Sequence, residues 1–250
     1  SALIGTKDVN NLRQRGYEVV AASPSTGINT ITGEGLADAL AGARVVVDVA
    51  NAPIWEDKAV LEFFETSGRN LLAAEATAGV GHHVALSIVG VDGLPDSGYM
   101  RAKAAQEKLI VESRLPYSIV RATQFHEFAE AIVASLTVGE EVRVPDALIQ
   151  PISAEEVAAK VASVAADAPL NGIVNIGGPD FLTFADLART VLAHRGTAKT
   201  VVVDPRAGYF GTPLGGRRTV PTRNPSFGPR FVPRRTIRML MRGMVISISP

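Results

Sequence analysis

The chain has 250 residues, of which 46% are hydrophobic, and it contains no cysteine. A chain of that length buries a sizeable core as one domain or as one domain with a small lobe, and the lack of cysteine excludes disulfides, thiolate nucleophiles and thiolate metal sites. No apolar run approaches the ~18 residues of a membrane helix and no basic-then-apolar leader is present, so we expect a cytoplasmic protein without a membrane span.

The net charge of zero hides an uneven distribution. Residues 1–194 carry 14 Lys/Arg and 24 Asp/Glu, whereas residues 195–250 carry 11 Lys/Arg and a single acid, Asp204. A basic segment can bind nucleic acid or an anionic surface, but poor order is the commoner property of such a terminus. We therefore expect residues 216–250 to form a poorly ordered basic tail and expect no nucleic-acid partner. A shift of reading frame in this segment, or a basic amphipathic contact with a membrane or partner, are the alternatives.

The first residues, SALIGTKDVNNLRQRG, lack features that normally open a nucleotide-binding sheet. Such a sheet starts with a strand and a Gly-rich turn, whose glycines let a pyrophosphate approach backbone N–H groups at a helix N-terminus. Gly5 is a candidate for the last glycine of that turn, with Asn10, Leu12 and Arg13 in the following helix. The first strand itself is apparently missing.

Strands and helices then alternate along the chain. Short apolar β-branched runs, typical of buried parallel strands, predict strands at 17–22, 44–50, 83–90 and 117–123. Apolar spacing and helix-forming residues predict helices at 56–79, 100–113, 151–169 and 183–196. Ser153 with Glu156 forms a capping box, while Thr183 and Gly196 mark the two ends of the last helix. This order predicts an α/β fold, a Rossmann-like doubly wound parallel sheet with a small C-terminal substrate lobe.

Tyr99 and Lys103 stand four residues apart at the start of a predicted helix. That spacing places both side chains on one face, where they reach the same ligand. A neighbouring ammonium favours the phenolate and lowers the pKa of a tyrosine toward neutral pH, which makes Tyr99 a candidate acid/base. Ser87, at the end of a predicted strand, would steady charge on a substrate oxygen. A surface Tyr–Lys pair on an amphipathic helix is the alternative.

The end of the second strand of such a sheet bears on the choice of cofactor. An acidic residue there binds the ribose hydroxyls of NAD, but the stretch AASPSTG offers Ser23, Ser25 and Thr26 and no carboxylate. The sequence therefore favours NADP, with NAD possible because no arginine is present to bind a 2′-phosphate.

Five stretches, in order, resemble one family. They are LSIVG with Ser87, YMRAK with Tyr99 and Lys103, YSIVRATQFHEF (117–128), PISAEEVA (151–158) and IGGPDFLTFADLA (176–188). Together they resemble the atypical short-chain dehydrogenase/reductases, specifically the NmrA-like NAD(P)H-binding branch, from about Ala2 to about Phe210. The resemblance implies a cofactor-binding core at 1–123 and a substrate lobe at 124–215 interleaved with it. It also implies that Lys103 holds the nicotinamide ribose and that further cofactor contacts come from Ala50, Asn51, Thr123, Gln124 and Phe125.

Aromatic residues after the strand ends suggest a pocket wall. Trp55, the only tryptophan, follows one predicted strand, and Phe125, His126, Phe128 and Tyr209 are the other candidates, although each also suits simple packing. Such a wall fits an apolar carbonyl, enone or quinone. The four histidines lack metal-site spacing and no Gly-x-Ser-x-Gly elbow occurs, so neither a metal nor Ser-His-Asp hydrolysis is expected.

The favoured function is NAD(P)H-dependent reduction of a small carbonyl or quinone-like compound, with Tyr99 as proton donor, Lys103 tuning it and Ser87 orienting the oxygen. A non-catalytic NAD(P)-binding redox sensor of the NmrA type is the alternative, and a sugar-nucleotide epimerase is the third. A small-molecule substrate is the expected partner, and the sequence leaves monomer and homodimer open.

Overall fold

The computed structural model describes residues 2–209, 212–214 and 237–240. Its helices are α1 (Ala2–Gln14), α2 (Leu36–Leu40), α3 (Asp57–Ala78), α4 (Gly98–Glu112), α5 (Ala129–Ser135), α6 (Ala154–Ala166) and α7 (Phe184–Arg195), with short 3-10 turns η1 (Pro24–Thr26), η2 (Val91–Gly93) and η3 (His126–Phe128). Its strands are β1 (Val19–Ala22), β2 (Val45–Asp48), β3 (His82–Ile88), β4 (Tyr117–Ala122), β5 (Thr137–Val138), β6 (Glu141–Val144), β7 (Leu148–Ile149), β8 (Gly172–Ile176), β9 (Leu182–Thr183), β10 (Thr200–Val203), β11 (Gly208–Tyr209), β12 (Thr212–Pro213) and β13 (Ile237–Leu240). None of these helices is long and apolar enough to cross a membrane.

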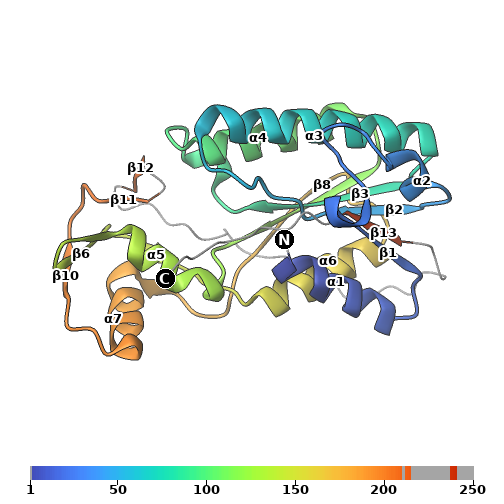
Figure 1. The fold of residues 1–250 in the computed structure, drawn as a ribbon. Coiled ribbons are helices and arrows are strands. Elements are labelled where there is room, and N and C mark those ends of the chain that lie inside the picture. The colour runs from blue at the N-terminus through green and yellow to red at the C-terminus, as the bar shows by residue number, and fades with distance from the viewer. Residues whose placement is uncertain (1, 210–211, 215–236, 241–250) are drawn as a thin grey trace.

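Six parallel strands form the main sheet, in the order β1-β13-β2-β3-β4-β8. Helices α3 and α4 cover one face, and α1 and α6 cover the other (Figure 1). Strand β2 is buried on both faces because helices lie on both, which explains its apolar run Val45, Val46 and Val47. The predicted doubly wound α/β fold is therefore confirmed.

The C-terminal strand β13 lies between β1 and β2. Met239 is opposite Ala21 on one side and Val47 on the other. We expected the whole of 216–250 to be poorly ordered, whereas residues 237–240 form a strand that pairs with β1 on one side and β2 on the other. The remainder of that tail lies outside the described residues. Within the described part of the chain, β1 joins the sheet through β13 alone.

Replacing Met239 with proline should open the sheet at β1. Proline has no N–H, and every residue of β13 has a strand on each side, so the change removes a ladder hydrogen bond and should lower the free energy of unfolding by about 1–3 kcal/mol. Hydrogen exchange should show lost protection at residues 19–22 with β3 and β4 retained. Met239→Val keeps a strand-forming residue and is the matched control. Unchanged protection at residues 19–22 in the proline variant would contradict the place of β13.

The capping residues predicted for α6 and α7 occupy the ends of these helices in the structure. Ser153 accepts a hydrogen bond from the Glu156 N–H in the predicted capping box, and Thr183 accepts one from Asp186 at the start of α7. Gly196 ends α7 with φ of 62°, a left-handed conformation that suits glycine. These local signals mark where α6 and α7 begin and where α7 ends.

Helix α1 begins at Ala2, earlier than expected. Gly5 is buried inside the helix and is not part of a turn, so its prediction as a turn glycine is wrong. The helix extends to the N-terminal side because Ile4, Val9 and Leu12 form an apolar stripe that packs with α6 in the core. Asp8 lies on the same stripe and is fully buried.

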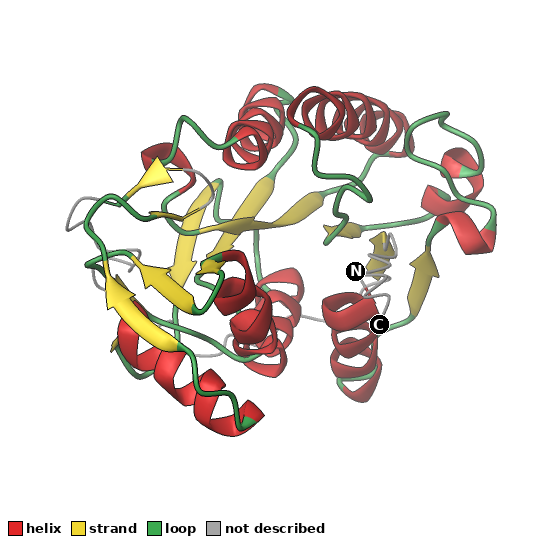
Figure 2. Ribbon diagram, turned by 60° about the vertical axis from the view of Figure 1, so that its left-hand side comes forward, coloured by secondary structure: helices red, strands yellow, loops and turns green. Residues whose placement is uncertain are grey.

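A small lobe stands beside the main sheet (Figure 2). Strands β10, β6 and β5 form a three-stranded sheet, and α7 packs against it together with α5. A separate hydrophobic core fills this lobe and includes Val142, Val144, Phe184 and Tyr209. The lobe thereby places α5 and β11 opposite the carboxyl ends of the main strands.

Candidate active site

A pocket of about 540 Å³ lies where the carboxyl ends of β2, β3 and β4 meet the small lobe. Loops that follow neighbouring parallel strands meet at this edge, where such sheets bind ligands. The pocket brings together most residues predicted for the site: Ala50, Asn51, Trp55, Ser87, Tyr99, Lys103, Thr123, Gln124, Phe125, Phe128 and Tyr209.

Four predicted residues lie outside its lining. Gly5 is within α1, although its neighbour Ile4 does line the pocket. Ser23 and Ser25 lie at η1, directly after β1, with their hydroxyls 2.7 Å apart, and neither lines this cavity. His126 begins η3 and is exposed. The structure thus gives His126 no place in the pocket wall.

The start of α4 fixes the direction of the two central side chains. The Ser97 hydroxyl accepts a hydrogen bond from the Met100 N–H, which caps the helix. Gly98 lets α4 approach α3 closely, because a Cβ there would lie 2.0 Å from Oδ1 of Asp57. Arg101 holds that carboxylate at 2.7 Å. Tyr99 therefore lies in a first helical turn that is fixed by the Ser97 cap and by the ion pair between Arg101 and Asp57 of α3.

Tyr99 is half-buried against an aromatic wall. Its ring centroid lies 5.2 Å from that of Trp55 and 6.2 Å from that of Phe64. Its hydroxyl donates a hydrogen bond of 3.0 Å to Oδ1 of Asn51. Burial raises the pKa of Tyr99, and the bond to Asn51 offsets only part of that rise. The expectation that Lys103 lowers this pKa is therefore wrong for this structure.

The ammonium of Lys103 has other partners. Nζ donates to the Leu86 carbonyl at 2.8 Å and to Oε1 of Gln106 at 2.5 Å, and it lies 4.7 Å from the centroid of the Phe64 ring. Burial lowers the pKa of Lys103 to about 8, while the charges of Asp48 and Glu107 oppose the fall. Lys103, at the pocket wall, therefore holds its proton less tightly than an exposed lysine.

Ser87 is at the pocket but is engaged by a carboxylate. Its hydroxyl donates to Oε1 of Glu107, which also forms an ion pair with Arg121. Arg121 in turn reaches Asp92 at 2.8 Å. Contact of Ser87 with an oxygen in the pocket would require its hydroxyl to turn away from Glu107.

Two groups of residues at the site were not predicted from the sequence. The first group adds apolar and small side chains to the wall: Ile4, Ala131, Ile132, Ser135 and Gly208. The second group is a buried polar set behind Lys103, made of Asp48, Gln106 and Glu107. A signal for it existed, because Asp48 interrupts the apolar run VVVDVA and Gln106 and Glu107 repeat the spacing of Lys103 along α4.

The parallel sheet, with helices on both faces and a pocket at the carboxyl edge, defines a Rossmann-like NAD(P)-binding protein. Residues 6–168 match the NAD(P)H-binding family. The chain belongs to this family of atypical short-chain dehydrogenase/reductases, as its sequence motifs indicated.

Several solved structures share the fold. NADPH-dependent quinone oxidoreductase QOR2 of Escherichia coli, in complex with NADPH, is 18% identical with a TM-score of 0.63 over 82% of this chain and 76% of that one. Triphenylmethane reductase of Citrobacter sp., in complex with NADP(H), is 17% identical with a TM-score of 0.57 over 81% and 75%. UDP-N-acetylglucosamine 4-epimerase of Bacillus cereus is 20% identical with a TM-score of 0.61 over 80% and 81%. No sequence of a curated protein matches the chain significantly.

Proposed function

We propose that this protein is an NAD(P)H-dependent oxidoreductase that reduces a small carbonyl or quinone-like compound. The observation that carries the proposal is the placement of Tyr99 and Lys103, side by side on α4, at the wall of a largely apolar pocket. The half-buried phenol keeps its proton at neutral pH, and it can pass that proton to a substrate oxygen as negative charge develops there beside the ammonium. The family and two of the similar reductases support this class of reaction.

The residues at the pocket fit a nicotinamide. Thr123 Oγ1 and Gln124 Oε1 are buried at its wall without a hydrogen-bond partner among the described residues, and a carboxamide would satisfy such atoms. Lys103 would hold the ribose, and Ala50 with Asn51 would border it. The bound cofactor supplies a hydride. The absence of a carboxylate at Ser23 and Ser25 favours NADPH over NADH.

Each central side chain then has a defined task. Tyr99 carries its proton at Oη, and Asn51 orients that hydroxyl. Lys103 places a positive charge at the wall, which stabilises negative charge that develops on the substrate oxygen. Ser87 would add a further hydrogen bond after turning from Glu107.

The lining favours a flat, uncharged substrate. Among the described residues, Lys103 is the only charged side chain in the wall, and Phe125 stacks with Phe128 at a centroid distance of 5.5 Å. A sugar nucleotide needs charged and polar groups for its diphosphate and hydroxyls, so the epimerase alternative ranks below the reductase. An aromatic carbonyl or quinone would bury its apolar surface here.

Titration with NADPH and NADH tests the proposal. Trp55 is the only tryptophan, is 58% exposed and lies at the pocket, so its fluorescence should fall as cofactor binds. Lys103→Met should weaken NADPH binding by about tenfold or more, because it removes a charged hydrogen-bond donor. Lys108→Met removes an exposed lysine of the same helix and should leave affinity unchanged. Failure of the folded protein to bind either cofactor would contradict the proposal.

A non-catalytic redox sensor remains the second candidate, favoured by one observation. The hydroxyl of Ser87 is engaged by Glu107, an arrangement that a protein which only binds the cofactor can retain. Turnover separates the two functions. The reductase should oxidise NADPH in the presence of at least one member of a panel of quinones and aromatic aldehydes, whereas tight binding without any turnover would favour the sensor.

A further inference from the structure

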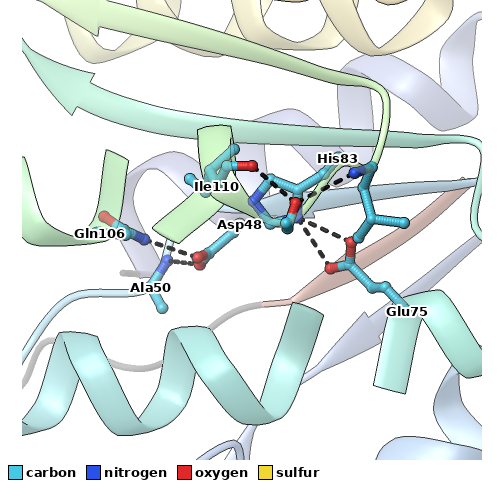
Figure 3. Close-up of polar contacts among 8 residues, drawn as sticks. Asp48, Ala50, Glu75, His83, Gln106 and Ile110 are labelled. Carbon is cyan, nitrogen blue, oxygen red and sulfur yellow. Dashed lines mark hydrogen bonds and ion pairs between the residues drawn. The ribbon is translucent and has the colours of Figure 1, made fainter. Parts of the chain in front are cut away.

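Gln106 lies one helical turn after Lys103 on α4, and its side chain is 4% exposed. Its Oε1 accepts the hydrogen bond from Lys103 Nζ. Its Nε2 donates at 2.8 Å to Oδ2 of Asp48 (Figure 3). A carboxamide is suited to this place because it has one acceptor for the ammonium and donors for the carboxylate. Gln106 thereby joins the two charged groups without contributing a charge.

Asp48 extends the connection to the other side of the pocket. It ends β2, is 5% exposed, and its Oδ1 accepts the Ala50 N–H at 2.9 Å (Figure 3). That bond fixes the loop after β2, which carries Asn51, and Asn51 accepts the hydroxyl of Tyr99. A chain of contacts therefore runs from Lys103 through Gln106 and Asp48 to the residue that orients Tyr99.

We propose that Gln106 and Asp48 are positioning residues, which hold the ammonium of Lys103 at the pocket wall and favour its charged form. The inference rests on the proposed function, since it assigns the pair to the residue that would contact cofactor and substrate. Without them, the buried ammonium would retain the Leu86 carbonyl and the Phe64 ring but lose the link to a carboxylate.

The other charges around Lys103 are engaged elsewhere. Glu107, on the same helix, favours the charged form of Lys103 but forms an ion pair with Arg121 of β4. Asp48 precedes Glu107 among the charges that favour the ammonium of Lys103, and its two carboxylate oxygens accept from Gln106 and from the backbone N–H of Ala50.

A second buried pair, Glu75 and His83, interacts electrostatically with Asp48. Glu75 of α3 and His83 of β3 lie 2.9 Å apart at the carboxylate oxygens and Nδ1 (Figure 3). Burial opposes the charged imidazole, but the Glu75 carboxylate outweighs it and raises the pKa of His83, with a further contribution from Asp48. Burial also raises the pKa of Glu75. Titration of this pair would therefore alter the field at Asp48, and measurements on Lys103 should be made in a variant series at identical pH values.

Two near-isosteric substitutions test the proposal by their opposite signs. Gln106→Met removes both hydrogen bonds and should shift the titration of Lys103 to lower pH by about one pH unit, because the ammonium loses its acceptor. Gln106→Glu places a carboxylate beside the ammonium and should shift the titration to higher pH by about one pH unit or more. NMR of protein labelled with ¹⁵N at lysine Nζ gives the titration, with the Lys103→Met variant assigning the signal and exposed Lys108 as internal reference.

The pH dependence of kcat/KM should shift in the same directions as the titration of Lys103. If charged Lys103 supports turnover, the loss of kcat/KM with rising pH should begin at lower pH in Gln106→Met and at higher pH in Gln106→Glu, an opposed shift that a general loss of stability would not produce. Unmoved Lys103 titration in both folded variants would overturn the proposal. Shifted titration in a protein that turns over no substrate would instead reject the reductase function and leave the positioning of Lys103 supported.

Discussion

Replacing Tyr99 with phenylalanine should lower turnover by about 10²–10⁴-fold, the usual contribution of a positioned proton donor. Phenylalanine retains the ring that packs against Trp55 and Phe64, and it lacks only the hydroxyl that donates to Asn51. Binding of NADPH should consequently stay within about threefold of the parent protein, since the ring and its aromatic contacts are retained. Steady-state kinetics with NADPH and an aromatic quinone, together with the Trp55 titration, measure both quantities.

Tyr17→Phe is the matched control for this change. It deletes the same atom from a tyrosine that precedes β1 and is not part of the pocket lining. Turnover should be unaffected by it. Equal turnover in Tyr99→Phe and Tyr17→Phe would remove the role of Tyr99 as proton donor while leaving cofactor binding in place.

The pH dependence of turnover should reflect Lys103 more than Tyr99. Burial raises the pKa of Tyr99, so its hydroxyl keeps the proton throughout the neutral range. Lys103, whose pKa is lowered to about 8, loses its charge as the pH rises through that value. Since the charged form is the one that stabilises a developing oxyanion, activity should decline above about pH 8.

The sequence predicted those features that depend on neighbours along the chain. Tyr99 and Lys103 share a helix, so their spacing alone placed them on one face. Ser153 and Thr183 were likewise found from local capping patterns. The approximate ends of β3 and β4 followed from apolar runs, and the meeting of the loops after them followed from the parallel order of the sheet.

Features that depend on pairing between distant segments were not predicted. Strand β13 joins the sheet more than 180 residues after its partner β2, and no local pattern states which gap it fills. Gln106 and Asp48 lie 58 residues apart in the sequence, and their contact forms only when α4 packs on the sheet. The prediction of Gly5 as a turn glycine was wrong for a related reason. Packing against α6 extends α1 through Gly5, although glycine has a low helix propensity.

Asp8 presents a different conflict between sequence and fold. It occupies the middle of the apolar stripe that α1 turns toward α6, it is fully buried, and neither carboxylate oxygen has a hydrogen-bond partner among the described residues. Burial raises the pKa of Asp8 to about 8 from an ordinary value of 3.8, and the nearby backbone of Ala162 offsets only part of the rise. The folded protein therefore retains a proton that the unfolded chain releases.

The sign of the resulting pH dependence follows from the two pKa values. Below about pH 4 both states bind the proton and Asp8 causes no pH dependence. Between about pH 4 and pH 8 the folded state holds a proton that the unfolded state has lost, so the free energy of unfolding falls as the pH rises. Above about pH 8 both states are ionised and the loss stays constant.

Asp8→Asn should abolish this loss. The amide has nearly the shape of the protonated carboxyl and does not ionise, so the variant should exceed the parent protein in free energy of unfolding by roughly 2–4 kcal/mol at pH 7, given about 1.4 kcal/mol per pH unit. Urea unfolding at pH 5, 6, 7 and 8 measures the difference, which should grow with pH. Asp146→Asn changes the same group at an exposed loop position and should shift stability by less than about 0.5 kcal/mol throughout. A difference between Asp8→Asn and the parent protein that stays flat across this range would mean that Asp8 is ionised in the folded state, and α1 would then have to pack against α6 less tightly than the structure describes.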